Sequence, residues 1–554
     1  MQFQADAPLI VESMGRILLE EDHPRIEEIR AGLTAFAHQV KTPEGMHTFQ
    51  LTPLSLWNAA ASGWSADRVV SFLRENSQWG LARSLDEELR ETMARYGLFR
   101  LESHPSGSIL LVCEDPERIR WARDHPIVGS RLVWVDDQRL RVDPVDRGWI
   151  KEEMMRQGYP VEDGAGYVEG EALAVQLRER LEGGQPFCLR GYQEQAVEIF
   201  NQHESGVLVL PCGAGKTVIG LAAMTRVGRA TLILTPNATS VQQWIREIRE
   251  KTDLPADAVG EYSGRCKEVR PVTVATYQIL THRDDSDGEF THLGLFEQRD
   301  WGLIIYDEVH LLPAPVFRAT AELQARRRLG LTATLVREDG NEEDVFSLIG
   351  PKRFEMPWKW MEQQGWIAEA ECVEVRVSMA ADRLRKYRQA KQQQRYRIAA
   401  ENPSKMDAVA HLVSHHQEKQ VLVIGQYLSQ LRAIAERLQA PLITGNTPQG
   451  ERESLYRAFR EGKISVLVVS KVANFAVDLP DTEAAIQVSG TFGSRQEEAQ
   501  RLGRILRPKK GENRAFFYNV VTRDSVDQEY AWNRRRFLVE QGYRYRWMDA
   551  EQWN

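Results

Sequence analysis

The stretch Val207-Leu-Val-Leu-Pro-Cys-Gly-Ala-Gly-Lys-Thr217 decides the fold class of this 554-residue chain. The apolar run 207–210 predicts a buried strand, Gly213 and Gly215 predict a tight loop, and the amphipathic residues 218–224 predict a helix. A loop of this kind surrounds a phosphate chain with backbone N–H groups at the start of a helix. The stretch therefore predicts an α/β domain that binds a nucleoside triphosphate.

A second apolar run, 303–306, ends in the adjacent carboxylates Asp307 and Glu308. Phosphoryl transfer depends on positioning and charge neutralisation, so each polar residue of the two motifs has an electrostatic task. Lys216 is expected to meet the β and γ oxygens, while the Thr217 hydroxyl and Asp307 are expected to hold Mg²⁺. Glu308 is then placed to orient and deprotonate the attacking water. The pair of motifs predicts triphosphate hydrolysis.

The loop on its own is a weaker signal than the loop and the carboxylates together. Leu210 stands where the general pattern G-x-x-x-x-G-K-[ST] has its first glycine, and many glycine-rich loops are only turns. The loop residues expected to line the nucleotide site are Pro211, Cys212, Gly213, Ala214, Gly215, Lys216 and Thr217.

Short Val/Ile/Leu runs alternate with helical stretches on both sides of these motifs. Runs of this type, with helices between them, are typical of parallel sheets covered on both faces. The runs fall into two groups, which predicts two tandem α/β lobes: 207–210, 231–234, 272–275, 303–306 and 328–332, then 420–424, 441–443, 465–469, 484–487 and 515–521.

The second lobe carries a candidate arginine pair. Arg504 and Arg507 follow Gln500 at the i+4 and i+7 positions of one predicted helix face, and Gly503 permits a close approach. Two guanidinium groups can stabilise the transition-state charge on a γ-phosphate once the lobes close. The alternative is a solvated basic helix.

Composition excludes several classes of protein. The chain has no apolar stretch near 20 residues and no export signal at its start, so we expect a cytoplasmic protein without a membrane span. Its five cysteines form no C-x-x-C pair, which argues against a disulfide framework, a zinc site or an iron–sulfur cluster. Residues 1–180 hold 30 acidic and 21 basic side chains, a charge of −9, which leaves +1 for the remaining residues of a chain whose net charge is −8. Global charge therefore says little about a nucleic-acid partner of the remaining residues.

Several motifs occur together in the order of a superfamily 2 helicase. They are Pro211-Cys-Gly-Ala-Gly-Lys-Thr217, Asp307-Glu-Val-His310, Thr332-Ala-Thr334 and the segment from Gln500 to Arg507. The triplet Arg337-Glu-Asp339, the segment from Gly490 to Arg504, and the N-terminal patterns Pro8-Leu-Ile10 and Thr52-Pro-Leu-Ser-Leu-Trp57 narrow the match. Over nearly its whole length the chain resembles the XPB family of DNA repair and transcription helicases, and most of all its prokaryotic branch.

This resemblance implies the following organisation. Residues 1–100 and 101–185 would be N-terminal α/β domains, the second resembling a damage-recognition domain and ending in a linker. Residues 186–362 and 363–554 would be two RecA-like lobes, and a basic, thumb-like helical insertion would occupy about 381–407.

The resemblance also assigns residues of the nucleotide site. Arg190 and Gln193 match the adenine-contacting motif, which implies ATP; alternatively, Gln193 only starts a helix. Asp478 matches the position that faces the ribose and the lobe interface, and Gln500 belongs to the arginine motif. Thr332 and Thr334 match the motif that links the ATP state to the grip on DNA, or they cap a strand end.

DNA contacts follow from the resemblance with less specificity. Polar groups after strands suit a sequence-independent grip on phosphates, although any one of them could lie in an ordinary loop. The residues concerned are Thr235, Thr276, Gln426, Thr444, Ser470 and Lys471. Arg337, Glu338 and Asp339 match an element of strand separation; the alternative is an internally paired surface salt bridge.

The basic insertion has no acidic residue between Arg383 and Ala400. Arg385, Lys386 and Arg388 can pair with phosphates, and the interleaved Tyr387 and Tyr396 can stack on bases. A solvated basic face is the alternative.

The sequence thus predicts an ATP-dependent, Mg²⁺-requiring DNA translocase and helicase, 3′ to 5′ by family analogy, that acts in nucleotide excision repair or DNA opening. Its expected substrates are forked, bubble or duplex DNA, with a nuclease or a repair or transcription protein as partner at the nucleoid. Two alternatives stay open at this point: a motor of the RNA helicase or restriction-translocase type, and an ATP-gated DNA clamp or scaffold that does not unwind.

Overall fold

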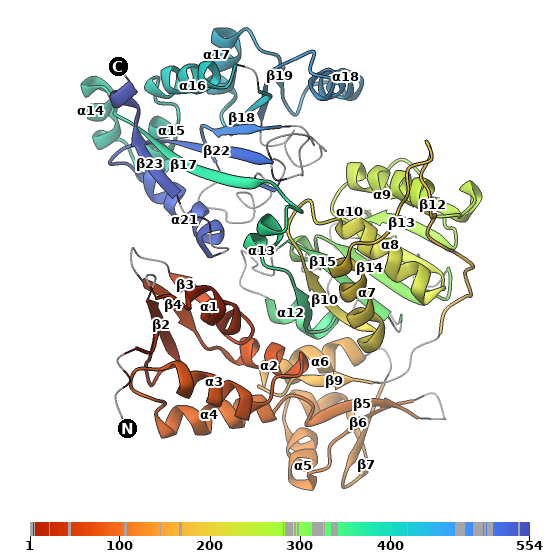
Figure 1. Ribbon diagram of the computed structural model, residues 1–554. Coiled ribbons are helices and arrows are strands. Elements are labelled where there is room, and N and C mark those ends of the chain that lie inside the picture. The colour runs from red at the N-terminus through yellow and green to blue at the C-terminus, as the bar shows by residue number, and fades with distance from the viewer. Residues whose placement is uncertain are drawn as a thin grey trace. The chain divides into compact units, whose positions relative to one another are not determined.

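The computed structural model describes residues 4, 6–20, 23–41, 46–104, 108–143, 146–164, 169–280, 282, 292, 295, 298–312, 325, 327–333, 342–417, 419–470, 482–490, 502–503, 506, 513–540, 543 and 545–553. The chain forms two compact units (Figure 1). The first contains residues 1–209 and 215–355, and the second contains residues 210–214 and 356–554.

The first unit begins with a small antiparallel sheet of order β1-β2-β4-β3 and four helices. Gly15, with φ +72°, turns the chain between the first two strands. The elements are β1 (Leu9–Val11), β2 (Arg16–Glu20), α1 (Ile26–Thr34), β3 (His38–Lys41), β4 (Met46–Gln50), α2 (Pro53–Ala61), α3 (Ala66–Asn76) and α4 (Arg83–Ala94). Thr52 and Ser65 cap α2 and α3 through their hydroxyls. Sequence analysis did not predict α4.

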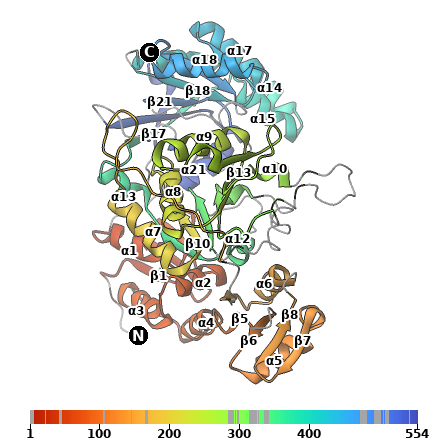
Figure 2. The same cartoon turned by 90° about the vertical axis from the view of Figure 1, so that its right-hand side faces the viewer.

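A second sheet, of order β7-β8-β6-β5-β9, follows in the same unit. Its elements are β5 (Phe99–Ser103), β6 (Ile109–Val112), α5 (Pro116–Asp124), β7 (Leu132–Asp136), β8 (Arg139–Val142), α6 (Arg147–Arg156) and β9 (Val161–Asp163). Helix α5 packs against β7 and β8 (Figure 2). Asp163, at the end of β9, forms buried ion pairs with Lys151 (3.0 Å) and Arg328 (3.5 Å), which ties this sheet to the one that follows.

The rest of the first unit is a seven-stranded, all-parallel sheet of order β12-β13-β11-β14-β15-β10-β16. Its strands are β10 (Ser205–Val209), β11 (Thr231–Thr235), β12 (Val259–Tyr262), β13 (Val272–Thr276), β14 (Leu303–Asp307), β15 (Arg327–Thr332) and β16 (Lys352–Glu355). The helices are α7 (Gly191–His203), α8 (Lys216–Val227), α9 (Ala238–Lys251), α10 (Tyr277–Leu280) and α12 (Glu342–Leu348).

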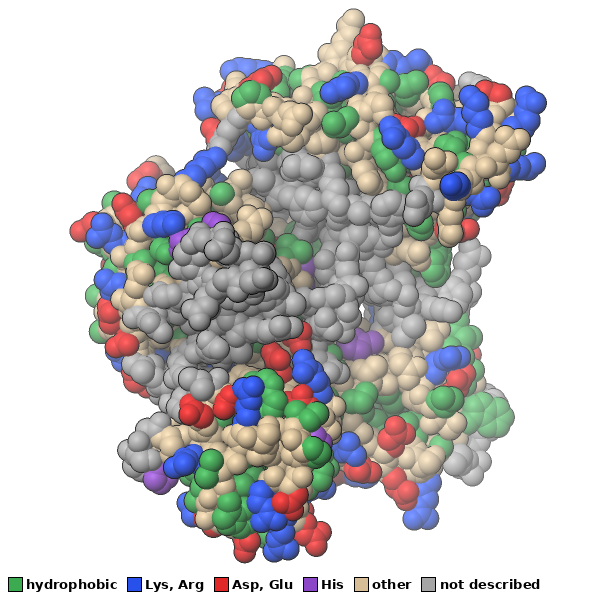
Figure 3. All heavy atoms as spheres, turned by 180° about the vertical axis from the view of Figure 1, so that it is seen from behind, with side chains coloured by type: hydrophobic (Ala, Val, Ile, Leu, Met, Phe, Trp, Pro, Cys, Tyr) green, Lys and Arg blue, Asp and Glu red, His purple; other side chains and the backbone are tan. Residues whose placement is uncertain are grey.

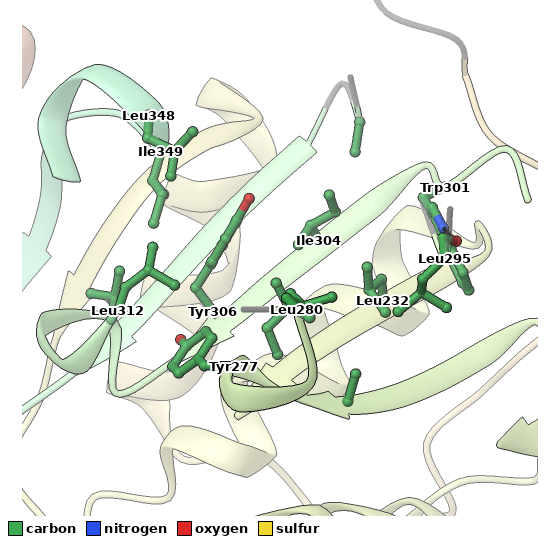
Figure 4. Close-up of a cluster of buried hydrophobic side chains, with 14 of the residues drawn as sticks. Leu232, Tyr277, Leu280, Leu295, Trp301, Ile304, Tyr306, Leu312, Leu348 and Ile349 are labelled. Atoms are coloured by element: carbon green, nitrogen blue, oxygen red, sulfur yellow. Dashed lines mark hydrogen bonds between the residues drawn. The ribbon is translucent and has the colours of Figure 1, made fainter. Parts of the chain in front are cut away.

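Nearly every strand residue of this sheet is buried, as expected for strands covered on both faces. Figure 4 shows one core cluster, in which Leu232, Ile304 and Tyr306 of the central strands pack with residues of the surrounding loops and helices.

The second unit repeats the architecture with a parallel sheet of order β19-β20-β18-β21-β22-β17-β23. Its strands are β17 (Glu369–Val377), β18 (Val421–Gly425), β19 (Leu442–Ile443), β20 (Val466–Ser470), β21 (Ala484–Gln487), β22 (Arg514–Thr522) and β23 (Tyr545–Asp549). The helices are α13 (Trp358–Gln363), α14 (Ala381–Gln389), α15 (Gln392–Ala400), α16 (Ser404–His415), α17 (Leu428–Leu438), α18 (Gln449–Arg460) and α21 (Val526–Glu540).

Two tandem parallel-sheet lobes, the predicted fold class, are therefore confirmed. Within the described ranges, no helix is both long enough and apolar enough to cross a bilayer.

Candidate functional site

The motifs of the first unit meet at the carboxyl edge of its parallel sheet. Strand β15 lies between β10 and β14, and the register pairs Val209 with Thr332 and Asp307 with Leu331. The three strands therefore end level with one another. In open parallel sheets this edge is where ligands bind.

Two glycines shape the loop between β10 and α8. Gly213 and Gly215 have φ of +85° and +75°, a region that residues with a Cβ rarely adopt. A Cβ on Gly215 would also lie 2.6 Å from Nε2 of Gln193. Gly215 is thus needed both for the turn and for the close approach of Gln193, and it delivers Lys216 as the first residue of α8.

A chain of polar contacts runs from this loop along the ends of the strands. The Lys216 Nζ lies 3.5 Å from Glu308 Oε1, and Glu308 Oε2 lies 3.5 Å from His310 Nδ1. The same His310 nitrogen is hydrogen-bonded to Thr332 Oγ1 at 2.7 Å. His310 and Thr332 are buried, whereas the Lys216 and Glu308 side chains retain 10% and 19% exposure. Lys216 and Glu308 are therefore accessible at the sheet edge, whereas His310 and Thr332 lie behind them in the interior.

The neighbours of Glu308 fix its ionisation. Burial raises the pKa of Glu308, but the positive charges of Lys216 and His310 outweigh burial and hold that pKa below its usual value. Glu308 is therefore a carboxylate at neutral pH. Its Oε2 atom is buried and accepts no hydrogen bond from the described residues, so it is available as an acceptor for a water molecule.

The backbone of Glu308 is itself unusual, with φ +48° and ψ +54°. The left-handed region is unfavourable for a residue with a long side chain and is typically retained where function requires it. The turn directs β14 into the short 3₁₀ helix Val309–Leu311, which carries His310.

Asp307 is held by two aromatic residues. The Trp244 Nε1 donates a hydrogen bond to its Oδ2 at 2.9 Å, and the Tyr277 hydroxyl donates to its backbone oxygen at 2.7 Å. Burial and the neighbouring Glu308 carboxylate raise the pKa of Asp307, against the hydrogen bond from Trp244 and the charge of Lys216. Sequence analysis did not predict the contact of Trp244 with Asp307, because only the fold brings these distant residues together, and it gave His310 no role of its own within the motif Asp307-Glu-Val-His310.

Arg190 and Gln193 lie at the start of α7. The Arg190 backbone N–H donates to Gln193 Oε1 at 2.9 Å, and the Arg190 side chain donates to the Tyr192 hydroxyl at 3.2 Å. Gln193 is thus both part of a helix-start contact and a neighbour of Gly215, so the two interpretations of this residue are compatible.

The residues of this edge fit a magnesium nucleotide. They supply backbone N–H groups at a helix start, a lysine, a threonine hydroxyl and an aspartate, which are the groups that bind phosphates and Mg²⁺. No group of three or more His, Cys, Asp or Glu side chains within the described part of the chain forms a metal cage.

Comparisons with known proteins agree with this geometry. The family description "ERCC3/RAD25/XPB C-terminal helicase" matches residues 361–552, "Type III restriction enzyme, res subunit" matches 187–337, and "Helicase conserved C-terminal domain" matches 9–133. The "DNA 3'-5' helicase XPB" of Kineococcus radiotolerans is 52% identical, over 99% of this chain and 97% of its own length. The chain belongs to the XPB family.

The resemblance predicted from the motifs is thereby confirmed, and membership of this helicase family implies nucleotide binding. The "DNA 3'-5' helicase XPB" of Mycobacterium tuberculosis is also 52% identical, over 99% of this chain and 98% of its own length. In Saccharomyces cerevisiae the "General transcription and DNA repair factor IIH helicase/translocase subunit XPB/SSL2" is 29% identical, over 98% of this chain and 72% of its own length. The solved structure "S. cerevisiae Dbp5 bound to RNA and ADP BeF3" is 14% identical, with a TM-score of 0.48, over 66% of this chain and 90% of that one.

Two of the residues expected from the XPB resemblance to contact DNA have buried hydroxyls. Thr235 and Thr276 are buried, at 0% and 5% exposure. The Thr235 hydroxyl donates to the Ala275 backbone oxygen, and the Thr276 hydroxyl accepts from the Ile279 N–H. Both hydroxyls are used within the turns that follow their strands, so the expectation that they face a DNA phosphate is wrong for this structure.

The second unit offers better candidates at the matching edge of its own sheet. Gln426 follows β18 and Ser470 ends β20, and the register pairs Gly425 with Ser470. The Gln426 Oε1 and the Ser470 Oγ are buried and have no hydrogen-bond partner in the described ranges. Thr444 instead forms a local turn with Asn446 and Thr447.

The basic insertion of the XPB chain consists of two helices whose cations divide into two sets. Arg383 and Arg395 donate to backbone oxygens, and Arg397 pairs with Glu401. Arg385, Lys386 and Arg388 are exposed and pair with no carboxylate of the described chain. In the view of Figure 3, Lys and Arg side chains are numerous over the upper part of the picture.

Tyr396 is buried and is not part of this basic surface. Its ring is 1% exposed and its hydroxyl is bonded to the backbone of Gly490, so the expectation that Tyr396 stacks on bases is wrong. The Tyr387 hydroxyl accepts a hydrogen bond from the Val526 N–H, which anchors α14 to the start of α21.

Several predicted residues lie outside the described residues: Arg337, Glu338, Asp339, Lys471, Asp478, Gln500, Arg504 and Arg507. Their roles stay predictions. Leu502 and Gly503 are helical, as expected for the arginine motif, and Leu502 is buried.

Proposed function

We propose that this chain is an ATP-dependent DNA helicase and translocase that moves 3′ to 5′ and acts in DNA repair or DNA opening. The observation that carries the proposal is the chain of contacts from Lys216 through Glu308 and His310 to Thr332 at the carboxyl edge of the first sheet. Relatives with 52% identity over nearly the full length are named DNA 3'-5' helicases.

The residues divide the hydrolysis of ATP between them. Lys216 and the backbone N–H groups of the loop bind the phosphates, and the ionised Glu308 orients a water molecule and accepts its proton. Trp244 and Tyr277 hold Asp307 in place. Thr217 and Asp307 would hold Mg²⁺, which would supply positive charge to the phosphate oxygens. Arg504 and Arg507 of the second lobe are proposed to stabilise charge on the γ-phosphate.

Thr332 links this chemistry to the rest of the lobe. Its hydroxyl bonds to His310, which also lies 3.5 Å from the Glu308 carboxylate, so a shift of β15 would move Glu308 through a single intervening residue. This contact supports the proposed role of Thr332 in joining the ATP state to the grip on DNA.

DNA is proposed to lie against the second unit at Arg385, Lys386 and Arg388, with Gln426 and Ser470 at the sheet edge. Exposed cations without a carboxylate partner are suited to phosphates, and neutral amides and hydroxyls suit a grip that ignores sequence. We propose the nucleoid as the place of action, with a nuclease or a repair or transcription protein as partner.

Strand displacement tests the proposal. Forks with a 3′ or a 5′ overhang are incubated with and without ATP, and ATPase activity is measured with duplex DNA, forked DNA and RNA. We expect ATP-dependent displacement from the 3′ overhang only, and stimulation by DNA above RNA. A preference for RNA would favour an RNA helicase, and DNA-stimulated hydrolysis without displacement or translocation would favour an ATP-gated clamp.

Neutralising the basic set tests the DNA surface. The triple variant Arg385→Gln, Lys386→Gln, Arg388→Gln removes three phosphate contacts, so the salt dependence of log K for duplex DNA should become shallower by up to about 2.7. A matched triple in α17 and α18, Arg432→Gln, Arg457→Gln, Arg460→Gln, removes three exposed arginines elsewhere in the unit and should leave the slope unchanged. Equal slopes for the first triple and the unmodified chain would contradict the assignment.

A further inference from the structure

Three consecutive residues after β21 are held by polar side chains from three different helices. Lys405 of α16 donates to the Val488 backbone oxygen at 2.7 Å. The Ser489 hydroxyl donates to Gln430 of α17 at 3.0 Å. The Tyr396 hydroxyl, on α15, accepts from the Gly490 N–H at 3.1 Å and donates to the Gly490 oxygen. We call residues 488–490 the junction.

The junction and the side chains that hold it are almost completely buried. Val488 and Ser489 are 0% and 1% exposed, and Tyr396, Lys405 and Gln430 are 1%, 0% and 6% exposed. Buried polar groups are costly when they lose a partner, so these contacts fix the backbone of the junction in one arrangement. Tyr396 is also wedged between other aromatic rings, with the ring of Tyr530 at a centroid distance of 4.9 Å. The tyrosine cannot move without its helix.

Two elements proposed to meet DNA are linked to the junction, one through a second helix and one directly. Helix α15 packs against α14, which carries the three exposed cations. The backbone N–H of Gln426, at the end of β18, donates to the Ser489 hydroxyl at 2.9 Å. If bound DNA displaces either element, the backbone at Ser489 or Gly490 should therefore shift.

In sequence, Gly490 is followed directly by the segment that leads to Arg504 and Arg507. The far end of that segment is also tied to the core, because the Ala368 N–H donates to the Leu506 oxygen at 2.7 Å and Leu502 and Leu506 are fully buried. The junction is thus a described attachment of the arginine-bearing segment.

We propose that Tyr396 is a positioning residue that couples DNA bound on α14 and at Gln426 to the arginine-bearing segment, through its paired hydrogen bonds with Gly490. The proposal rests on the proposed function, since it supplies the route by which DNA stimulates hydrolysis. Tyr396 contacts neither nucleotide nor DNA in this scheme. Its effect is on the rate at saturating DNA and not on affinity.

The variant Tyr396→Phe tests the coupling because it keeps the ring and removes only the hydroxyl. Loss of the two hydrogen bonds to Gly490 should lower kcat of the DNA-saturated ATPase about tenfold, the ratio that corresponds to roughly 1.4 kcal/mol. The DNA concentration for half-maximal stimulation, and the hydrolysis rate without DNA, should each change less than twofold.

The matched control is Tyr518→Phe. Tyr518 lies in β22 of the same unit, is 6% exposed, and its hydroxyl bonds to the buried His416 at 2.8 Å. Its loss removes a buried tyrosine hydroxyl of the same kind away from the junction, so kcat with DNA should stay within twofold of the unmodified chain.

Equal kcat for Tyr396→Phe and Tyr518→Phe would overturn the proposal, and so would a raised half-saturating DNA concentration with unchanged kcat, which would make Tyr396 a DNA contact. Should Tyr396→Phe fail to fold, Ser489→Ala decides, because it breaks the contact from Gln426 to the junction and is expected to show the same loss of kcat. An unmodified chain whose hydrolysis does not respond to DNA would instead refute the proposed function.

Discussion

Each of the two large sheets of this protein has seven strands that run parallel within the sheet, yet their carboxyl edges differ in chemistry. The first edge carries charged side chains, since Glu308 lies 3.5 Å from Lys216 through one carboxylate oxygen and 3.5 Å from His310 through the other. Among the residues that the structure describes, the second edge carries the neutral groups Gln426, Ser470 and the backbone of the junction 488–490.

This difference shows that one architecture can be used for two tasks. Charges placed at the end of β14 can change a reaction barrier because they act on developing charge. Neutral amides and hydroxyls hold a backbone or a phosphate without preference for a reaction. The first edge is thus suited to hydrolysis, and the second to gripping DNA and relaying its presence.

Glu308→Gln should give the largest effect. The substitution keeps shape and hydrogen bonding but removes the base, so kcat for ATP hydrolysis should fall by about 10²- to 10⁴-fold. Phosphate release at saturating DNA measures the loss, and binding of a fluorescent nucleotide should persist. At the second edge, Gln426→Ala should lower kcat less than tenfold. Similar losses for both variants would erase the difference between the edges.

Asp527→Ala should have the largest effect on stability. Asp527 pairs with Lys405 at 2.6 Å, and both side chains are almost fully buried. Removing one partner leaves a buried ammonium, at a cost of about 3–5 kcal/mol in the free energy of unfolding. Because Lys405 also holds Val488, the loss should fall on the second sheet.

The urea midpoint, followed by tryptophan fluorescence, measures this loss. Asp407→Ala is the matched control, because Asp407 pairs with Arg437 at 2.6 Å on the surface of the same unit, with both side chains more than half exposed. Its removal should cost at most about 1 kcal/mol. Equal midpoints for the two variants would show that the buried pair does not support the second edge.

The interior of the second unit should also respond to acid. Burial, together with the charges of His415 and Lys419, lowers the pKa of His416 to about 4. The unfolded chain, with an ordinary histidine pKa near 6.5, therefore binds a proton first as the pH falls, and stability is lost from pH 6.5 downward. The loss from this group should reach about 2 kcal/mol at pH 5.

Unfolding midpoints at pH 7 and pH 5 test this expectation. The variant His416→Phe removes the titrating group and should show a smaller difference between the two pH values than the unmodified chain. The variant His415→Gln removes an exposed neighbour and should keep most of the difference. A pH difference that survives intact in His416→Phe would place the acid sensitivity elsewhere.

The sequence predicts what is local in this protein. The apolar runs identify five of the seven strands of each sheet and miss β12, β16, β17 and β23. The residues next to the identified runs, such as Lys216 and Glu308, follow with them. Contacts between distant residues could not be predicted: His310 and Thr332 are 22 positions apart, Trp244 and Asp307 are 63 apart, and Tyr396 and Gly490 are 94 apart. Each depends on the strand order, which periodicity does not encode.

The errors of sequence analysis have the same origin. Thr235 ends a strand and Tyr396 lies in a basic helix, and both are residue types that are suited to contacting nucleic acid. The fold turns both side chains inward, where their hydroxyls satisfy backbone groups of Ala275 and Gly490. Whether a hydroxyl serves solvent or backbone is decided by packing.

The smallest expected effect concerns the outermost strands of the two sheets, β16 and β23. The edge strand β16 of the first sheet is covered by α2, because the Lys352 N–H donates to Asn58 Oδ1 at 2.9 Å and the Ser62 hydroxyl donates to the Lys352 oxygen at 2.7 Å. On the edge strand β23 of the second sheet, Trp547 is 57% exposed. Asn58→Ala should cost about 1 kcal/mol, the usual net value of one hydrogen bond.

Hydrogen exchange at the Lys352 amide reports this contact directly. Exchange should be faster in Asn58→Ala, whereas Asn58→Asp keeps an acceptor oxygen at the same place and should retain protection. Unchanged exchange in Asn58→Ala would mean that α2 does not protect the β16 edge. The two sheets would then be equally open at their sides, and the covered edge would no longer distinguish the first sheet from the second.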